Sequence, residues 1–141
     1  MTTTTMGRCL AAGQAALKTT VVAPGAPKAI GPYSHAVTSG GLVYTSGSLG
    51  VDGDGNLADD VTAQTQLALE NLGAVLAAVG ASHGDVVKTL VLLDSMDDFP
   101  AVNEVYASFF PENPPARSCF AVHTLPLGAK VEIEAIAEIP Q

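Results

Sequence analysis

Two stretches of the chain repeat their apolar residues with the period of an amphipathic α-helix. Over residues 61–79 the apolar side chains recur every three or four positions, while Gln64 and Asn71 fall on the opposite, polar side. Two aspartates stand before this stretch, where either can accept a hydrogen bond from the first helical turn, and Gly80 follows it. The pattern predicts a helix with one side in the core.

A second helix is predicted over residues 99–110. Phe99, Tyr106 and other aromatic residues gather on one side of it, and Asn103 falls on the other. One of the two aspartates before Phe99 is expected to cap this helix through its side chain. A proline in the first turn suits a helix start, and Pro111 ends the segment.

Short segments rich in β-branched residues predict strands. They cover residues 19–22, 35–38, 42–46, 86–93, 117–122 and 130–138. Gly40 and Gly41 supply the positive φ angles that a tight hairpin turn requires between the second and third of them. Residues 86–93 form an almost continuous apolar run, which predicts a central strand that is buried on both faces.

The final strand alternates apolar and charged residues. Val131 and Ile133 point to one face, and Glu132 points to the other. If this strand pairs with the preceding one across a turn at 125–129, a carboxylate from it approaches Arg117. By the pattern alone, the favoured interpretation of Glu132 is one member of a solvated strand face.

The order of these elements indicates an α+β fold, in which two helices cover one face of a mostly antiparallel or mixed sheet. No further helix is predicted for the other face, so another subunit is its simplest cover. The composition agrees, because 48% of the residues are hydrophobic, only 14% are charged, and the mean hydropathy is +0.32. No apolar run is long enough to span a bilayer, so we expect this apolar surface to form an interface in an oligomer.

A chain of 141 residues fits a single domain, which we assign to residues 19–141. Residues 1–18 are interpreted as an N-terminal extension. The extension contains no acidic residue and resembles an organelle transit peptide, although a simple tail fits slightly better. We therefore expect the protein in the cytoplasm, or in a plastid or mitochondrion if the extension is a targeting signal.

The net charge of −8 argues against a protein that tracks a phosphate backbone. Aromatic residues make up only 5% of the chain, which disfavours a stacking platform for single-stranded nucleic acid. The two cysteines, Cys9 and Cys119, form no disulfide framework and favour a reducing compartment. His35, His83 and His123 lack the spacing of metal ligands, so no metal site is predicted.

Arg117 is the best candidate for a binding residue. It is one of only two arginines and opens a predicted strand two residues after Pro115. A guanidinium can bind a carboxylate through two parallel hydrogen bonds, but a structural ion pair is an equally good interpretation.

Tyr33 follows a stiff Gly-Pro turn, where it is either a phenol at a pocket rim or a core or interface aromatic. Gly47 lets another group approach the backbone closely.

A series of short motifs runs through the chain. They are Ala-Pro-Lys-Ala-Ile-Gly-Pro-Tyr-Ser at 26–34, Tyr-Thr-Ser-Gly at 44–47, Val-Val-Lys-Thr at 86–89, Asp-Phe at 98–99, Val-Asn-Glu-Val-Tyr at 102–106, Pro-Ala-Arg-Ser-Cys at 115–119 and Val-Glu-Ile-Glu-Ala-Ile-Ala at 131–137. With these motifs in this order, nearly all of residues 19–138 resembles the Rid family, the reactive intermediate deaminases that are also called the YjgF family.

The resemblance implies a chorismate-mutase-like α+β fold and a homotrimer with clefts between subunits. It implies the hydrolysis of 2-imino and 2-enamino acids, such as 2-aminoacrylate, to 2-keto acids and ammonia without a cofactor. Arg117 would hold the substrate carboxylate, Glu132 would position or activate water, and Tyr33 would line the cleft. The substrate-binding residues that the resemblance implies are Arg117, Gly47, Cys119, Ser46 and Asn103.

Two positions depart from the family pattern and leave the substrate preference open. Ser48 follows the Ser-Gly of the second hairpin strand, and His35 follows Tyr-Ser, whereas glutamine is common at both positions in relatives.

Two other functions stay open. One is a single-strand endoribonuclease or translation inhibitor, which the acidic composition disfavours. The other is a ligand-binding or chaperone-like trimer without catalysis, which the sequence does not separate from an enzyme.

Overall fold

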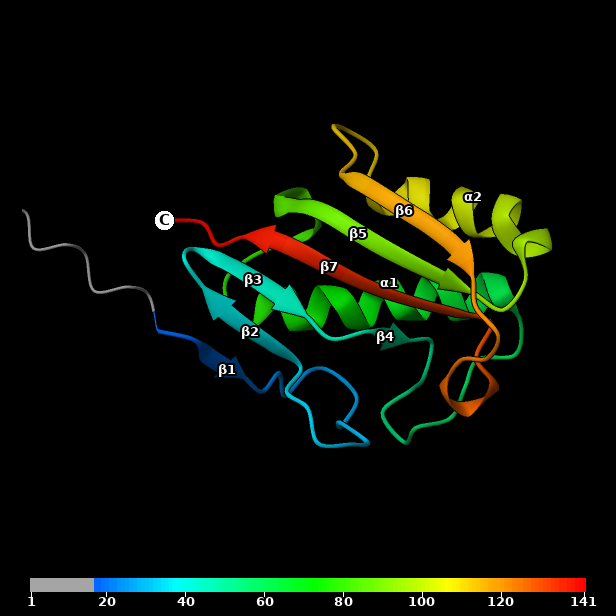
Figure 1. Cartoon of the computed structure of the whole chain (residues 1–141), viewed down its shortest axis with the longest axis horizontal. Helices are drawn as coiled ribbons and strands as arrows, with labels where there is room; N and C mark the ends of the chain where they lie inside the picture. The colour runs from blue at the N-terminus through cyan, green and yellow to red at the C-terminus, as the bar shows by residue number, and fades with distance from the viewer. Residues whose placement is uncertain (1–16) are drawn as a thin grey trace, which may run out of the picture.

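The computed structural model describes residues 17–141, and the interpretation of the N-terminal extension lies almost wholly outside this part. The described residues form a seven-stranded sheet with two α-helices (Figure 1). Both helices lie on the same side of the sheet, behind it in Figure 1. The predicted α+β class, with two helices on one face, is therefore confirmed.

The strands run in the spatial order β1-β2-β3-β7-β5-β6, and β4 pairs with β7 beyond the end of β3. Their bounds are Thr19–Val21 (β1), Ala36–Ser39 (β2), Leu42–Thr45 (β3), Ser48–Leu49 (β4), Val86–Leu93 (β5), Ala116–Ala121 (β6) and Val131–Glu138 (β7). β5 and β6 run parallel and every other pair is antiparallel, so the sheet is mixed. Gly40 and Gly41 have φ angles of +60° and +81° in the β2–β3 turn, as predicted.

Helix α1 spans Val61–Ala77, and the Asp60 side chain accepts a hydrogen bond from the Ala63 N–H at its start. Helix α2 spans Phe99–Phe109. The predicted aspartate cap of α2 is wrong, because Asp98 makes no capping hydrogen bond through its side chain. A 3₁₀ turn leads into α2 instead, and the side chain of Ser95 accepts a hydrogen bond within it.

The core lies between the sheet and the helices, where Leu69, Leu72 and Ile133 are fully buried. Two residues assigned to the polar side of α1 turn inward, which corrects the prediction. Gln64 is only 2% exposed, because its amide donates to the Ala58 carbonyl and accepts from the Lys130 N–H.

Asn71 is the second inward-turned polar residue of α1. Its amide donates to the carbonyl oxygens of Leu49 and Val51, both at 2.9 Å. Gln64 and Asn71 therefore bind backbone groups of the loops around β4 and before β7. Helix α1 in this way fixes the segments that surround the candidate site.

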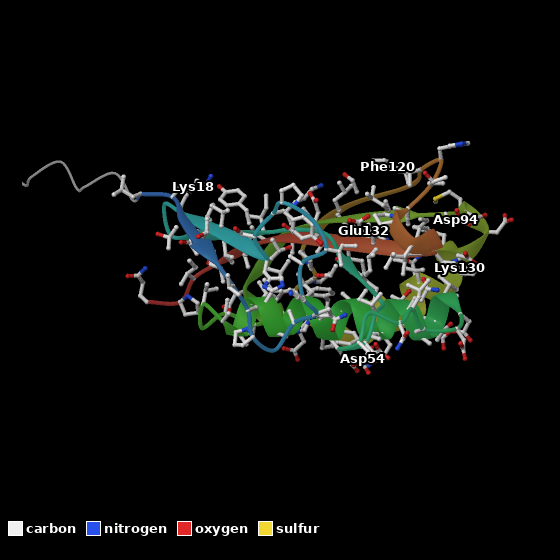
Figure 2. The ribbon with its side chains drawn as sticks, turned by 90° about the horizontal axis from the view of Figure 1, so that it is seen from below. Lys18, Asp54, Asp94, Phe120, Lys130 and Glu132 are labelled. Carbon is white, nitrogen blue, oxygen red and sulfur yellow. The ribbon has the colours of Figure 1, made fainter. Side chains whose placement is uncertain are left out.

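β5 is the central strand that the apolar run predicted, with β7 on one side and β6 on the other. The prediction that both its faces are buried is wrong for the single chain. Val91 and Leu93 pack under the helices, whereas Val87 on the other face is 41% exposed. Phe120 of β6 lies on this open face as well, on the side of the sheet away from α1 (Figure 2).

The last two strands do not pair with each other, contrary to the arrangement considered from the sequence. β5 lies between them and pairs with both. The segment β5–α2–β6 is a strand–helix–strand unit, and a crossover of this kind makes the two strands parallel. No helix within residues 17–141 has the length and apolar character needed to cross a bilayer.

Candidate active site

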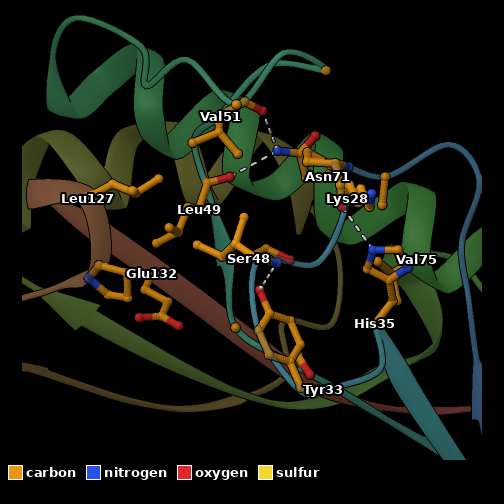
Figure 3. Close-up of a pocket in the computed structure, with 18 of the residues that line it drawn as sticks. Lys28, Tyr33, His35, Ser48, Leu49, Val51, Asn71, Val75, Leu127 and Glu132 are labelled. Atoms are coloured by element: carbon orange, nitrogen blue, oxygen red, sulfur yellow. Dashed lines mark hydrogen bonds between the residues drawn. The ribbon is translucent and has the colours of Figure 1, made fainter.

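A cavity of about 580 Å³ lies where β3, β4 and β7 meet the loop before β2 (Figure 3). Four of the predicted site residues line it together: Tyr33, Ser46, Gly47 and Glu132. The other three, Asn103, Arg117 and Cys119, belong to α2 and β6 and lie outside it. The structure thus divides the predicted site residues into two groups.

Glu132 is the acidic centre of the cavity. It lies on β7 with Leu49 on one side and Leu92 on the other, and its side chain leaves the sheet on the face away from the helices. Glu132 lies on the open face that the alternation of the strand indicated, but it is only partly exposed and its carboxylate lines the cavity. Within residues 17–141, the carboxylate accepts no hydrogen bond and can therefore bind water or a ligand.

Burial raises the pKa of the Glu132 carboxyl above its ordinary value of 4.5, and the neighbouring Glu134 carboxylate raises it further. A carboxylate with a raised pKa is a stronger base than an exposed one. The position of Glu132 therefore favours proton transfer with a bound water molecule.

Gly47 lies under Glu132. A Cβ atom at this position would come within 2.7 Å of the carboxyl carbon of Glu132, so the Glu132 side chain would have to shift. The absence of a side chain is what allows Glu132 to lie over the backbone. This contact gives a physical reason for the Ser-Gly motif at the end of β3.

Tyr33 lies at the rim of the cavity and is 47% exposed. The Ile30 N–H donates to its hydroxyl oxygen at 3.3 Å, and the Tyr33 N–H donates to the Gly31 carbonyl, so a tight turn fixes the ring. Figure 3 shows its hydroxyl pointing toward the cavity. In the single chain Tyr33 is therefore a phenol at a pocket rim and not a core aromatic.

Hydrogen bonds within the chain engage two further polar residues of the cavity. His35 accepts from the Ala23 N–H at 2.8 Å and lies 2.8 Å from the Pro27 carbonyl, which its other ring nitrogen reaches as a donor. The Ser46 hydroxyl donates to the Ser34 carbonyl at 2.6 Å. These side chains hold the loop in place.

Arg117 opens the second group. Its Nη1 donates to the Asn103 side-chain oxygen at 2.8 Å. The guanidinium carbon lies 4.7 Å from the ring centroid of Tyr106 and 5.5 Å from that of Phe99, which are cation–π distances. One amide oxygen and two aromatic rings thus fix the guanidinium, while its remaining N–H groups stay available for a carboxylate.

The prediction that Asn103 lies on the opposite side of α2 from Phe99 and Tyr106 is wrong, because all three residues contact the Arg117 guanidinium. They recur at spacings of four and three along α2, which places them on one stripe of the helix. A stripe that combines two aromatics with an amide, on the helix before an arginine-bearing strand, is the signal that could have found this group.

Cys119 lies two residues after Arg117 and points to the same face of β6. Burial raises the pKa of its thiol above 9.0, and the nearby Arg117 offsets only part of that effect. The thiol is therefore protonated near neutral pH, which disfavours a nucleophilic thiolate.

Arg117 and Glu132 point to opposite faces of the sheet. Arg117 stands beside the buried Thr89 of β5, and its guanidinium reaches α2. Glu132 pairs with Leu92, three residues further along β5, and therefore lies on the open face. A single chain cannot bring these two side chains to one small substrate.

Among the residues that the structure describes, no group of three or more histidine, cysteine, aspartate or glutamate side chains is arranged to hold a metal ion. The available chemistry comes from a carboxylate, a phenol and backbone groups in the cavity. A guanidinium with a matching amide lies at the β6 edge of the sheet.

Comparison with known proteins shows the family to which this chain belongs. The model of the family described as Endoribonuclease L-PSP matches residues 23–139, and the chain belongs to this family, whose curated members include the reactive intermediate deaminases. The Rid resemblance of the sequence motifs is therefore confirmed.

Two curated relatives are similar over most of the chain. The 2-iminobutanoate/2-iminopropanoate deaminase of Salmonella typhimurium is 47% identical over 122 residues, which cover 84% of this chain and 95% of the relative. The chloroplastic Reactive Intermediate Deaminase A of Arabidopsis thaliana is 46% identical over 116 residues, which cover 81% of this chain. The match covers only 62% of the Arabidopsis protein.

Solved structures show the same fold. The crystal structure of Escherichia coli TdcF with bound serine has a TM-score of 0.78 and 44% sequence identity to this chain. The match covers 81% of this chain and 93% of TdcF.

Proposed function

We propose that the protein hydrolyses 2-imino and 2-enamino acids, such as 2-aminoacrylate, to 2-keto acids and ammonia. The observation that carries this proposal is the Glu132 carboxylate, which faces the cavity beside Tyr33 and Gly47 without a hydrogen-bond donor in the described chain. The names of the Salmonella and Arabidopsis relatives support the same activity.

In the proposed reaction Glu132 orients water against C2 of the imino acid. The water oxygen forms a bond to C2 while the C=N electron pair moves to nitrogen, and Glu132 takes one proton from the water. That proton passes to the nitrogen of the resulting carbinolamine. The C–N bond then breaks as the C2 hydroxyl becomes the keto group, so both water hydrogens end on ammonia. An enamino acid enters this sequence after it tautomerises to the imine, as C3 takes a proton from solvent and the nitrogen releases one to solvent. The reaction transfers no electrons to a cofactor.

Arg117 binds the substrate carboxylate in this proposal. Its Nη1 is engaged by Asn103, and the rings of Tyr106 and Phe99 hold the guanidinium in place, so the free edge can form two hydrogen bonds to a carboxylate. A fixed carboxylate places C2 against the water on Glu132, and such positioning can supply a large part of a rate enhancement.

We infer that each site takes Arg117 from one copy of the chain and Glu132 from another. The two side chains leave opposite faces of the sheet in one chain, which supports a shared site. The open face carries exposed apolar residues such as Val87 and Phe120, and β6 is an edge strand, so both surfaces can pack against further copies. The family resemblance favours three copies.

The test is an assay in which an amino-acid oxidase generates the imine and semicarbazide traps it. We expect the wild type to suppress semicarbazone formation. Arg117→Ala should lose about 100-fold in rate, the usual order for a lost positioning group. Glu132→Gln should lose roughly 100- to 10,000-fold, the range of general acid–base catalysis.

Two control variants separate these effects from charge and folding. Glu70→Gln removes an exposed carboxylate of α1 and should leave the rate unchanged. Arg117→Lys keeps the positive charge but loses the planar fork, and should recover only part of the activity. Hydrolysis at the wild-type rate by both Arg117→Ala and Glu132→Gln would contradict the proposed function.

The alternative cleavage of single-stranded RNA has weaker support. The family description contains the word endoribonuclease. Against it stands the net charge of −8, which gives little attraction for a phosphate backbone.

A further inference from the structure

We propose that one end of the cavity is a compartment for the side chain of the imino acid, and that Leu127 makes this compartment prefer large apolar side chains. The inference rests on the proposed function. Within the proposed substrate class, it gives 2-imino acids of the kind formed from leucine or methionine an advantage over three-carbon acids such as 2-aminoacrylate.

Leu127 has an unusual backbone conformation for a leucine. Its φ angle is +59° and its ψ angle 15°, in the left-handed region that favours glycine. The side chain is 57% exposed, so the leucine contributes little to the core in return. Strained residues of this kind concentrate at ligand sites, and Leu127 lines the cavity (Figure 3).

The turn that carries Leu127 is fixed on both sides. Leu125 and Ala129 are 8% and 1% exposed, and the Ala129 N–H donates to the Pro126 carbonyl at 3.0 Å. The next residue, Lys130, donates its N–H to the buried Gln64 side chain at 2.8 Å. Leu127 is therefore held at the cavity by its neighbours, as a specificity residue requires.

The wall beside Leu127 is apolar and equally fixed. Leu49 and Val51 line the cavity, and the Asn71 amide binds both of their carbonyl oxygens. Val75 of α1 lines the cavity as well. The exposed charged residues that line it, Lys28 and Asp54, are of opposite sign and give no net charge for recognising a second ionic group.

In the single chain the cavity has a volume of about 580 Å³ and is partly open, so this volume is an upper bound for the compartment once a second copy adds Arg117. The side chains of His35 and Asn71 already form hydrogen bonds to backbone groups. They therefore have few hydrogen-bonding groups left for a polar side chain of the substrate. A branched or long apolar side chain would displace water from these walls. Its burial therefore favours the larger imino acid.

The experiment compares two imines in the trapping assay, one made by D-amino-acid oxidase from D-alanine and one from D-leucine. C2 of the imine is planar, so the configuration of the amino acid is lost. We expect the wild type to have a kcat/KM about tenfold higher for the leucine-derived imine, the usual discrimination by an apolar pocket.

Leu127→Gly is the decisive variant, because glycine adopts the observed φ angle without strain and the fold is preserved. It should lower kcat/KM for the leucine-derived imine about tenfold and for the alanine-derived imine less than about twofold. Leu127→Met keeps the apolar volume and should keep the preference. Met96→Ala removes an exposed apolar side chain outside the cavity and should change neither value.

Three results would overturn the inference. The first is that Leu127→Gly lowers kcat/KM for both imines equally, and the second is that it leaves both values unchanged. In either case turnover by the wild type would still support the proposed function. A changed oligomer mass of Leu127→Gly in sedimentation would make Leu127 a contact between copies instead.

If the wild type hydrolyses neither imine, the proposed function is wrong. The inference about the compartment can then still be tested by measuring binding. Calorimetric titrations with 4-methyl-2-oxopentanoate and pyruvate then decide. Tighter binding of the larger acid that Leu127→Gly abolishes would support the compartment, and equal or absent binding of the two acids would reject it.

Discussion

Glu132 lies directly over the backbone of Gly47, so closely that a Cβ atom on Gly47 would stand 2.7 Å from the Glu132 carboxyl carbon. Gly47→Ala must therefore displace the carboxylate from the cavity. We expect kcat to fall about 100-fold, because small displacements of catalytic groups have effects of this order. Steady-state kinetics of imine hydrolysis measures the loss.

Gly84→Ala is the matched control for Gly47→Ala. A Cβ atom on Gly84 meets only the Ser82 hydroxyl at 3.6 Å, an ordinary contact, and its φ angle is not positive. This variant should keep full activity. Unchanged activity in Gly47→Ala would show that the position of Glu132 over Gly47 does not matter for the reaction.

Asn103 acts through Arg117. Asn103→Ala removes the 2.8 Å hydrogen bond to Nη1 and frees the guanidinium to rotate. We expect kcat/KM to fall roughly tenfold to 100-fold, in line with a hydrogen bond to a charged group worth about 1.5–3 kcal/mol. Because Asn103 orients the carboxylate-binding residue, KM should rise, and the pH dependence of kcat should stay that of the wild type. An unchanged KM would contradict this role.

Tyr106 joins the Arg117 group to the core. Its hydroxyl lies 2.7 Å from the Thr89 hydroxyl in a buried pair, and its ring lies under the guanidinium. Tyr106→Phe keeps the ring but leaves the Thr89 hydroxyl without this partner. We expect the free energy of unfolding to fall by about 1–3 kcal/mol, while kcat/KM stays within about twofold. Urea denaturation together with the kinetic assay separates the two effects.

Glu132 should make stability and activity depend on pH in opposite directions. Burial raises its pKa above 4.5, so the native state binds the proton more tightly than the unfolded state. The stabilisation from this proton is fully present below the ordinary carboxyl pKa and is lost as the pH rises through the raised value. Activity needs the carboxylate, so kcat should rise over that same window.

Glu132→Gln tests both parts of this prediction. The variant should be more stable than the wild type at pH 8. The difference in the free energy of unfolding should shrink as the pH falls through the raised pKa of Glu132 and level off below its ordinary value of 4.5. Thermal unfolding across this pH range measures it. A variant less stable than the wild type at pH 8 would show that the buried carboxylate is not a destabilising group.

Local elements of the fold could be predicted because local signals determine them. The helical period over α1, the two glycines of the β2–β3 turn and the apolar run of β5 each depend on neighbouring residues. The parallel pairing of β5 with β6 was missed, although the strand–helix–strand order around α2 contains the signal.

Other features of the fold depend on contacts between segments that are distant in the sequence. The periodicity of hydrophobic residues contains no information about such contacts. Gln64 and Asn71 are polar yet turn inward, because each satisfies backbone groups of loops far from it in the sequence. For the same reason, the sequence does not reveal that the site residues form two groups, one around Glu132 and one around Arg117. Only the strand order shows that Arg117 and Glu132 lie on opposite faces of the sheet.

The central claim is that one active site uses Arg117 of one copy and Glu132 of another. Its most direct test mixes two inactive variants, Arg117→Ala and Glu132→Gln, by unfolding and refolding them together in equal amounts. Random mixed oligomers should recover about a quarter of wild-type activity, since half of the copies retain each residue and a site needs one of each. Native mass spectrometry verifies the mixing. Mixed oligomers that stay as inactive as the separate variants would contradict the shared site.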